Sequence, residues 1–506
     1  MNQQDNMQTK DYWRGRLSGK MPENVLNFIS SLNEDARLVE IDIDVVQAHN
    51  LMLYRQNIIS KEDAAKIMDG LEKARSAWQS GQLKLANYID IHPLVESYLM
   101  DSYGVEIGGK SHLGKSRNDQ VMADVRIYLR NATLETSELL ADFCDILLNL
   151  AQAHTQTLMP GYTHTQQAQV ITLAHYLLSY SGAFQRDMER LEQCYSRINL
   201  NPLGACALAG TSLPLDRNYT SELLGFDDVL ENSIDAISNR DFAVELAGHL
   251  ANLMATLSRM ANDLILWSSY EFAMVELADE LTDISSAMPQ KKNPCPLEML
   301  RGKTGTVYGN LMQLLTMLHA TPTGYNKDLQ ETKPPLWQAL DTVQASLRVL
   351  CQVWNNITIK KERMYQLVCE NQITALDLAE LLVRSGLAFR QAHFLVGQLV
   401  RECSRQGKAA WQNLNVKQVN DTAQTVAGKT LELNQEELSA AINPAQSVAS
   451  RSVIGGPAEI QTKAALIKQR QKLSEQRQKA EDKRAKLKST HENLKMSVRD
   501  LQINPA

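Results

Sequence analysis

Apolar residues at helical spacing dominate the middle of the chain. Between residues 241 and 267 they alternate steps of four and three, at Leu246, Leu250, Leu253, Leu257, Met260 and Leu264. The same spacing recurs at Leu340, Val343, Leu347, Leu350 and Trp354, and at Leu139, Phe143, Ile146 and Leu150. Such seams pack a helix against near-parallel neighbours. Several seams in one region, with little strand-like alternation, predict an all-α fold built on a long central helix bundle.

Breaks in this pattern divide the chain into four parts. Residues 1–111 carry shorter helical patterns, interrupted at Met21-Pro22, Gly81 and His92-Pro93. The long seams occupy residues 112–360, and shorter amphipathic segments such as 374–385 and 389–405 follow until Gly455-Gly456-Pro457. We therefore expect an N-terminal helical domain (1–111), a central long-helix bundle (112–360), a C-terminal helical domain (361–460) and a charged helical tail (461–506).

The tail has an apolar residue at every seventh position. The series runs Leu466, Leu473, Ala480, Leu487, Leu494 and Leu501. Only one heptad position is consistently apolar, so the seam is thinner than that of a strong coiled coil. Two interpretations stay open, a solvated helix resting on its own subunit and a helix that binds a partner.

Composition narrows the class of protein. The chain has 506 residues and a net charge of -6, which argues against a dedicated nucleic-acid binder because phosphate contacts need a basic face. No apolar run reaches about 18 residues and the first residues lack an apolar signal core, so we expect neither a membrane span nor secretion. Seven scattered cysteines without a C-x-x-C pair suit a reducing cytoplasm. The ten histidines show no metal-ligand spacing, so no metal is expected.

Residues 282–298 hold the densest group of reactive side chains. The run reads Thr-Asp-Ile-Ser-Ser-Ala-Met-Pro-Gln-Lys-Lys-Asn-Pro-Cys-Pro-Leu-Glu. Three prolines and adjacent cations do not fit a buried helix. The run therefore predicts a mobile loop whose hydroxyls can handle a proton and whose ammonium groups can meet an anion, although a solvated linker is the plain alternative.

This loop resembles the signature of the fumarase/aspartase superfamily, Gly-Ser-Ser-x-Met-Pro-x-Lys-x-Asn-Pro, and its Gln-Lys-Lys-Asn-Pro form is similar to the argininosuccinate lyase branch. Residues 112–121, 161–169 and 325–333 resemble three further segments of that branch. In order, they read His-Leu-Gly-Lys-Ser-Arg-Asn-Asp-Gln-Val, Gly-Tyr-Thr-His-Thr-Gln-Gln-Ala-Gln and Tyr-Asn-Lys-Asp-Leu-Gln-Glu-Thr-Lys. The resemblance implies a three-domain lyase without a cofactor. It also implies a homotetramer with the bundle as its core and active sites shared between chains.

The implied reaction is a β-elimination that splits argininosuccinate into arginine and fumarate, a step of arginine biosynthesis. Removing a proton beside a carboxylate builds up negative charge, which preplaced cations and hydrogen-bond donors must meet. The reaction also needs a base, and an acid for the departing nitrogen. The resemblance implies that Ser285 takes the proton and that His164, paired with Glu298, serves the leaving nitrogen; Lys291 supplies a cation. Substrate-binding roles are implied for Ser31, Asp35, Ser116, Arg117, Asn118, Thr163, Asn293, Tyr325, Gln330 and Lys333.

Each of these residues also has a plainer interpretation when taken singly. A lone His164 is usually structural, Glu298 would be a helix-surface charge and Tyr325 a packed aromatic. Arg117 and Asn118, next to Asp119, could simply cap a helix, since short polar side chains satisfy the free N–H groups there. The joint pattern of four segments is what favours the lyase.

Several positions depart from the family pattern. Ile284 replaces a glycine before the serine pair, which should stiffen the loop. Leu113, Lys115, Thr165, Val170, Cys206 and Thr332 replace Thr, Arg, Leu, Pro, Gly and Asp. These departures leave open a related lyase that eliminates fumarate from a different N-succinyl substrate. A non-catalytic scaffold on the same fold, like the lens crystallins that resemble this branch, is a third possibility.

Overall fold

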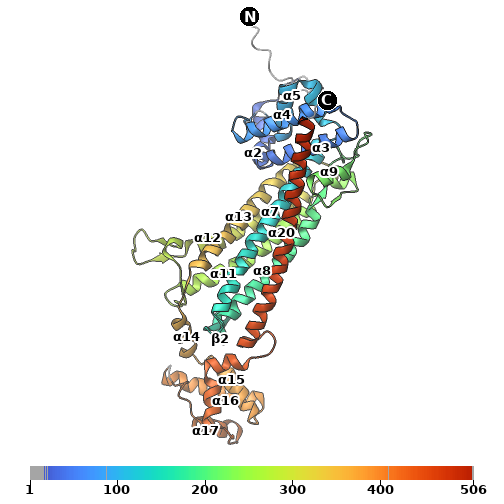
Figure 1. Cartoon of the computed structure of the whole chain (residues 1–506). Coiled ribbons are helices and arrows are strands. Elements are labelled where there is room, and N and C mark those ends of the chain that lie inside the picture. The colour runs from blue at the N-terminus through green and yellow to red at the C-terminus, as the bar shows by residue number, and fades with distance from the viewer. Residues whose placement is uncertain (1–15, 18, 20, 87, 408–409, 504–506) are drawn as a thin grey trace.

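Five long helices form the central bundle (Figure 1). The computed structural model describes residues 16–503 except 18, 20, 87, 408 and 409. The bundle consists of α7 (Arg117–Ala153), α8 (Leu173–Ile198), α11 (Asp241–Ser268), α12 (Cys295–Leu318) and α13 (Lys333–Asn356). Every seam residue predicted in α11 and α13 is buried, and Phe143 of α7 is buried with Leu139, Ile146 and Leu150 partly buried beside it. The predicted all-α bundle is confirmed.

Shorter helices cover the end of the bundle where α7 begins. They are α1 (Glu23–Ile29), α2 (Leu32–Asp35), η2 (Ala36–Leu38), α3 (Val39–Arg55), α4 (Lys61–Gln79), α5 (Ile91–Tyr103), α6 (Val105–Gly108) and η3 (Gly109–His112). The break predicted at His92-Pro93 is wrong, because both residues lie in the first turn of α5, where a proline costs no helical hydrogen bond. Residues 1–15 of the expected N-terminal domain lie outside the described residues.

The helices that follow the bundle are α14 (Lys361–Glu370), α15 (Ala375–Arg384), α16 (Phe389–Gln406), α17 (Val416–Ala427), α18 (Gln435–Ile442) and α19 (Pro444–Ser450). Met364 and Leu367 of α14 belong to the core of the bundle, whereas α15 to α18 have a hydrophobic core of their own. Leu382, Leu395 and Trp411 are buried in a cluster separate from that of the bundle. We propose that a distinct C-terminal domain begins after α14, somewhat later than the expected boundary at residue 361.

Short strands and helices connect the long elements. Two antiparallel hairpins project from the bundle, β1 (Leu158–Thr163) with β2 (Gln166–Thr172) and β6 (Asp283–Ile284) with β7 (Lys292–Asn293). The other pairs are β3 (Leu200–Asn201) with β4 (Asp228–Val229), which are parallel, and β5 (Val275–Glu276) with β8 (Thr358–Ile359). The remaining elements are α9 (Arg217–Leu224), α10 (Ser233–Ser238), η4 (Asp279–Leu281) and η5 (Lys327–Thr332).

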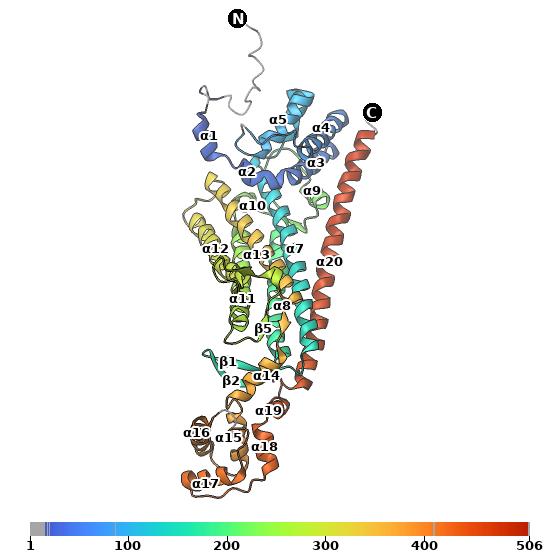
Figure 2. The ribbon, with the colours of Figure 1, turned by 90° about the vertical axis from the view of Figure 1, so that its left-hand side faces the viewer.

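The tail forms one long helix, α20 (Glu459–Ile503), along the outside of the bundle (Figure 2). Its predicted apolar series is buried at Leu466, Leu473, Ala480, Leu494 and Leu501, while Leu487 is partly exposed. Within one chain, α20 packs on α7 and α8 of its own subunit. Among the described residues, no helix is long and apolar enough to cross a membrane.

Candidate functional site

Charged residues gather where the N-terminal helices meet the bundle. Lys333, the first residue of α13, forms an ion pair with Asp35 at the end of α2, and both side chains are almost fully buried. The Ser31 hydroxyl donates to Asp35 at 2.7 Å, and the Lys333 ammonium lies 3.4 Å from that hydroxyl. A buried charge is tolerated only when it is paired. The chain therefore brings together three of the residues singled out from the sequence.

Tyr325 and Gln330 extend this group. The Gln330 amide donates to the Tyr325 hydroxyl at 2.5 Å. Burial raises the pKa of Tyr325 to about 12, so the phenol keeps its proton at neutral pH. The amide oxygen of Gln330 is buried and has no hydrogen-bond partner within the described part of the chain. An unsatisfied buried acceptor is costly, so this oxygen is available to a donor on a bound molecule.

Arg117 joins the same region through residues that the sequence did not reveal. Its guanidinium donates to Asp90 at 3.4 Å, and His92 donates to the other oxygen of Asp90 at 3.0 Å. The second nitrogen of His92 lies 2.9 Å from Asp124 and 3.8 Å from Asp42. We call Ser31, Asp35, Asp90, Arg117, Tyr325, Gln330 and Lys333 the bundle-end cluster, with His92, Asp42 and Asp124 buried behind it.

The protonation of this region follows from burial and charge. Burial opposes a charge on His92, but Asp42, Asp124 and Asp90 outweigh it and raise the pKa of His92 well above its usual range. Burial also acts against ionised Asp90, yet His92 and Arg117 hold its pKa well below normal. An imidazolium between carboxylates therefore keeps Asp90 ionised and facing Arg117. The sequence signal was an Asp-x-His at the start of a helix with isolated acids, Asp42 and Asp124, in apolar surroundings.

Ser116 caps α7. Its hydroxyl accepts from the Asn118 backbone N–H, while Asp119 accepts from the Ser116 N–H at 2.9 Å, which completes a capping box. The backbone N–H groups of Gly204 and Cys206 also donate to Asp119, and burial raises its pKa to about 6. A helix cap is thus present, but Ser116 and Asp119 form it, while the Asn118 side-chain amide donates to the Ala207 carbonyl at 3.0 Å. The cap places Arg117 in the first turn of α7.

Thr163 and His164 lie at the tip of the β1–β2 hairpin. His164 and Thr165 both have positive φ, 53° and 60°, as a two-residue hairpin turn of this type requires. Glycine and asparagine adopt this conformation more easily, so two other residues here mark a strained position. Both Thr163 and His164 are exposed, and His164 makes no hydrogen bond or ion pair with any described residue.

The serine loop is a second projecting hairpin, visible on the left of Figure 1 between α11 and α12. Ile284 pairs with Lys292 across β6 and β7, and Ser285 follows directly. The Ser285 hydroxyl accepts from the backbone N–H of Met288 at 3.1 Å. The sequence predicted a mobile loop over residues 282–298, and its end is placed too late, because residues 295–298 form the first turn of α12. Within the loop, β6 and β7 pair as short strands. Lys291 and Glu298 are exposed and Asn293 is half-buried.

The two hairpins and the bundle-end cluster do not meet within one chain. Arg117 starts α7 and the β1–β2 hairpin follows its other end, and a helix of 37 residues is about 55 Å long. The serine loop precedes α12, whose other end leads toward η5 and the cluster, and its 24 residues span about 36 Å. Among the described residues, no hydrogen bond or ion pair joins His164, Ser285 and Glu298.

Comparison with known proteins identifies the family. The lyase family profile matches residues 15–309, and the profile of the argininosuccinate lyase C-terminal region matches residues 372–449. An argininosuccinate lyase of Methanosarcina barkeri is 42% identical over 90% of this chain and 92% of its own length. That of Desulforamulus reducens is 43% identical over 91% of this chain and 98% of its own. The chain belongs to the argininosuccinate lyase family. It is therefore an enzyme of the lyase class.

Solved structures agree with this family. EDDS lyase in complex with formate superposes with a TM-score of 0.87 at 31% identity, over 96% of this chain and 97% of that one. A variant of EDDS lyase with bound fumarate covers 98% of this chain and 99% of that one, with a TM-score of 0.86 at 30% identity. Class II fumarase from Schistosoma mansoni shares the fold at 16% identity, with a TM-score of 0.67 over 81% of this chain and 90% of that one.

The departures from the argininosuccinate lyase family pattern have local partners. Lys115 is buried and donates to Gln120 at 2.6 Å, and Gln120 in turn donates to Asp42. Thr332, which replaces an aspartate of the family pattern, is buried, and its hydroxyl donates to the Leu329 carbonyl at 2.7 Å. The hydrogen bond satisfies this buried hydroxyl locally. Ile284 is 70% exposed and packs against little of its own chain. These substitutions are therefore accommodated without disturbing the bundle-end cluster.

Two groups of potential metal ligands occur among the described residues, although the sequence spacing predicted none. One is Asp42, His92 and Asp124; the other is Cys194 with Glu245 and His249. Both groups combine residues from different elements, so spacing along the chain could not show them. Side chains of both groups already have partners within the chain, because His92 lies between carboxylates and Glu245 pairs with Arg197.

Proposed function

We propose that this chain cleaves argininosuccinate into arginine and fumarate, in active sites assembled from several copies of the chain. The observation that carries the proposal is the placement of the matching segments. The cluster around Arg117, the His164 hairpin and the Ser285 hairpin lie far apart in one chain, yet each carries family residues that are exposed or only partly engaged. One chain alone does not bring these three segments together, so the proposal requires several copies of the chain, and we propose a homotetramer.

The surface of α12 supports this assembly. One face of the helix packs into the bundle through buried Leu300, Thr304 and Val307. On another face, Tyr308, Met312 and Leu315 expose apolar side chains on neighbouring turns. Three glycines, Gly302, Gly305 and Gly309, have open space where a side chain would lie. Exposed apolar side chains beside glycines that permit close backbone approach suit packing against a helix of another copy.

The chemistry follows from the groups on each segment. Ser285 would remove the proton from the substrate carbon next to a carboxylate, and Lys291 with Asn293 would meet the charge that develops. His164, with Glu298 beside it, would give a proton to the departing guanidinium nitrogen. Arg117, Asn118 and Thr163 would hold the carboxylates of the succinyl half. A hairpin that closes over the substrate would exclude water and strengthen these contacts.

The other half of the substrate would occupy the remainder of the bundle-end cluster. Its cationic groups suit Asp35 and the free amide oxygen of Gln330, with Ser31, Tyr325 and Lys333 completing the wall. Ser116 would act through its cap of α7, which orients Arg117. We propose a cytoplasmic location, in keeping with the seven free cysteines.

A second candidate is elimination of fumarate from another N-substituted aspartate. It is favoured by the EDDS lyase structures, which match nearly the whole chain at about 30% identity. Lys115 in place of arginine also removes a guanidinium, whose fork cannot be reproduced by an ammonium.

A substrate screen tests the proposal. Purified protein would be given argininosuccinate, adenylosuccinate, aspartate and malate separately, and fumarate release followed by absorbance at 240 nm. We expect turnover of argininosuccinate well above that of the others. Turnover of a different succinyl compound would favour the second candidate, and no fumarate from any of them would overturn both.

A further inference from the structure

The long helix α20 joins two parts of the molecule. Its 45 residues make it about 68 Å long. It packs on α7 and α8 along most of its length and on α9, α3 and α4 near its C-terminal end. Figure 2 shows it on the side of the bundle opposite α12. The C-terminal family profile ends at residue 449, before α20 begins. The match to EDDS lyase reaches into the helix, because the 4% of the chain outside it is shorter than α20.

Opposite charges hold the middle of α20. Its cations face acids of the body in a one-sided pattern, with Lys472 on Glu189, Arg477 on Asp142 and Asp145, Lys479 on Glu192, Arg484 on Glu138 and Lys486 on Asp227. The contact of Arg484 with Glu138 is bidentate, at 2.7 and 3.1 Å. A single exposed pair is weak, but a bidentate pair within a network is not.

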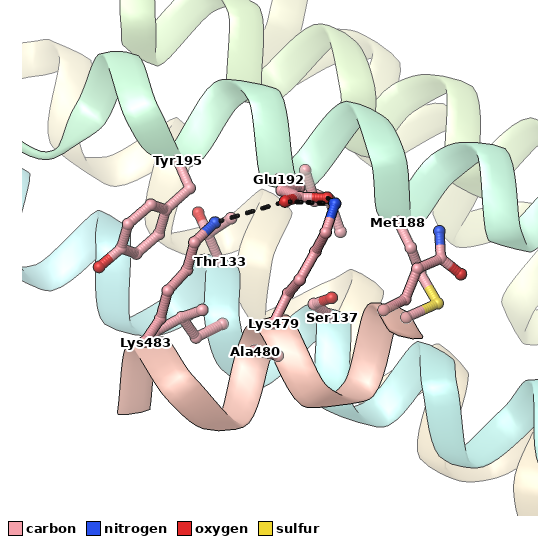
Figure 3. Close-up of a pocket in the computed structure, with 11 residues that line it drawn as sticks. Thr133, Ser137, Met188, Glu192, Tyr195, Lys479, Ala480 and Lys483 are labelled. Carbon is pink, nitrogen blue, oxygen red and sulfur yellow. Dashed lines mark hydrogen bonds and ion pairs between the residues drawn. The ribbon is translucent and has the colours of Figure 1, made fainter. Parts of the chain in front are cut away.

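Packing under this stretch is incomplete at one point. Ala480 takes the place of leucine in the heptad series, and a cavity of about 20 Å³ lies beside it between α7, α8 and α20 (Figure 3). That is room for about one water molecule. Lys479 and Lys483 reach over the gap to Glu192 (Figure 3). The ion pairs therefore contribute a larger share of the binding of α20 to the bundle here than they would if a leucine filled this position.

Apolar side chains anchor the far end. Leu494, Val498 and Leu501 are buried in the same core as α3 and α4, while Met496 and Ile503 on the same turns are exposed. His491 of α20 lies 3.3 Å from Asp44 of α3. Two residues earlier, α3 carries Asp42 beside His92. The end of α20 thus packs on the helix that also supports the charges behind Arg117.

The N-terminal helices are held to the bundle on the substrate side as well. Lys333 pairs with Asp35, Arg37 pairs with Asp341, and the Trp337 indole donates to the Glu34 carbonyl at 3.1 Å. All three contacts involve α13 and the segment around α2 and η2. The helix α3 also packs directly on α7, where Gln120 donates to Asp42, whereas α4 packs on α3, α5, α6 and α20. The attachment of α4 therefore depends more strongly on α20 than that of α3 does.

We infer that α20 is a positioning element, which fixes α3 and α4 against the bundle and so sets the bundle-end cluster for substrate. The expected change in KM rests on the proposed function, whereas the expected change in hydrogen exchange of α3 and α4 does not. Among the described residues, no hydrogen bond or ion pair joins α20 to a member of the bundle-end cluster, so α20 acts through α3 and its neighbours.

The first test removes the apolar anchor. Leu494→Ala/Leu501→Ala is compared with the matched control Met496→Ala/Ile503→Ala, which alters exposed side chains on the same turns. Hydrogen exchange of α3 and α4 should rise at least about threefold in the first variant, because local opening becomes easier. The KM for argininosuccinate should rise about three- to tenfold with kcat within about twofold, since displaced binding groups weaken substrate contact. The control should match wild type in both measurements.

The second test reverses the Arg484–Glu138 ion pair, and it remains informative if the first double variant fails to fold. Arg484→Glu should raise exchange of α3 and α4 and the KM in the same direction, and adding Glu138→Arg should restore both by reversing the pair. Restoration by the swap is not expected of a helix that only covers the surface. Exchange that rises in α20 alone, or a KM that stays at the wild-type value in both tests, overturns the inference.

The two proposals fail in different ways. If wild type releases no fumarate from argininosuccinate, the proposed function fails, and exchange of α3 and α4 alone decides the positioning role. If wild type turns over normally while α3, α4 and KM are unaffected by the α20 variants, only the positioning role fails.

Discussion

The bundle-end cluster and the two projecting hairpins differ in how far one chain completes them. In the cluster, Lys333 and Asp35 are paired and almost fully buried, and Arg117, although partly exposed, is paired with Asp90. On the hairpins, His164 is exposed without a partner and Ser285 contacts only its own turn. A group that is already paired is preorganised, whereas the side chains of His164 and Ser285 have no partner outside their own turns among the described residues. The difference is what an active site shared between copies requires.

The largest effect is expected on the serine hairpin. Ser285→Ala should lower kcat by about two to four orders of magnitude, because a proton-transfer group is lost. The helical content and thermal unfolding should stay at wild-type values, since Ser285 contacts only its own turn. Fumarate release and circular dichroism measure the two quantities. Ser286→Ala is the control, and if both variants behave alike, Ser285 does not have the assigned role.

The opposite behaviour is expected in the cluster. Lys333→Met leaves Asp35 buried without its cation, which should lower the free energy of unfolding by about 3–5 kcal/mol as well as weaken activity. Lys292→Met, on the β6–β7 hairpin, breaks exposed pairs with Glu276 and Asp279 and should change stability only slightly. Urea unfolding compares the two variants. Equal stability loss would remove the distinction between the two regions.

A smaller, pH-dependent effect is expected behind Arg117. The folded-state pKa of His92 is raised, so its contribution to stability is fully present below about pH 6.5 and is lost as pH rises through the raised value. At pH 6, His92→Gln should lower the free energy of unfolding by about 2 kcal/mol, through loss of charged hydrogen bonds. The gap to wild type should narrow at alkaline pH. The exposed His319→Gln is the control, and a gap that widens with pH would contradict this account.

The sequence predicted the bundle well because its seams repeat over many turns. Each position in the α11 and α13 series turned out to be buried, as helical spacing alone required. It also singled out Ser31, Asp35, Arg117, Tyr325, Gln330 and Lys333, which the fold brings to one end of the bundle. It missed Asp90 and His92 because their role depends on contacts with Asp42 and Asp124 from other helices. The break placed at His92-Pro93 failed for a related reason, since proline is harmless in a first helical turn.

The paired strands of the serine loop were also missed from sequence. β6 and β7 are only two residues each, and such a pair has no visible alternation. For the tail, the heptad series predicted a helix, but not which of two surfaces it would contact. The acids that decide this, such as Glu138 and Glu192, lie hundreds of residues away in the chain.

Mixing two inactive variants tests the shared site most directly. His164→Asn and Ser285→Ala chains would be purified, mixed during refolding, and assayed for fumarate release once mixed tetramers are confirmed by mass. If each site takes His164 and Ser285 from different chains, random assortment should give intact pairs at about one quarter of the sites. Activity near a quarter of wild type is the predicted result. Mixed tetramers without recovered activity would contradict a site shared between copies.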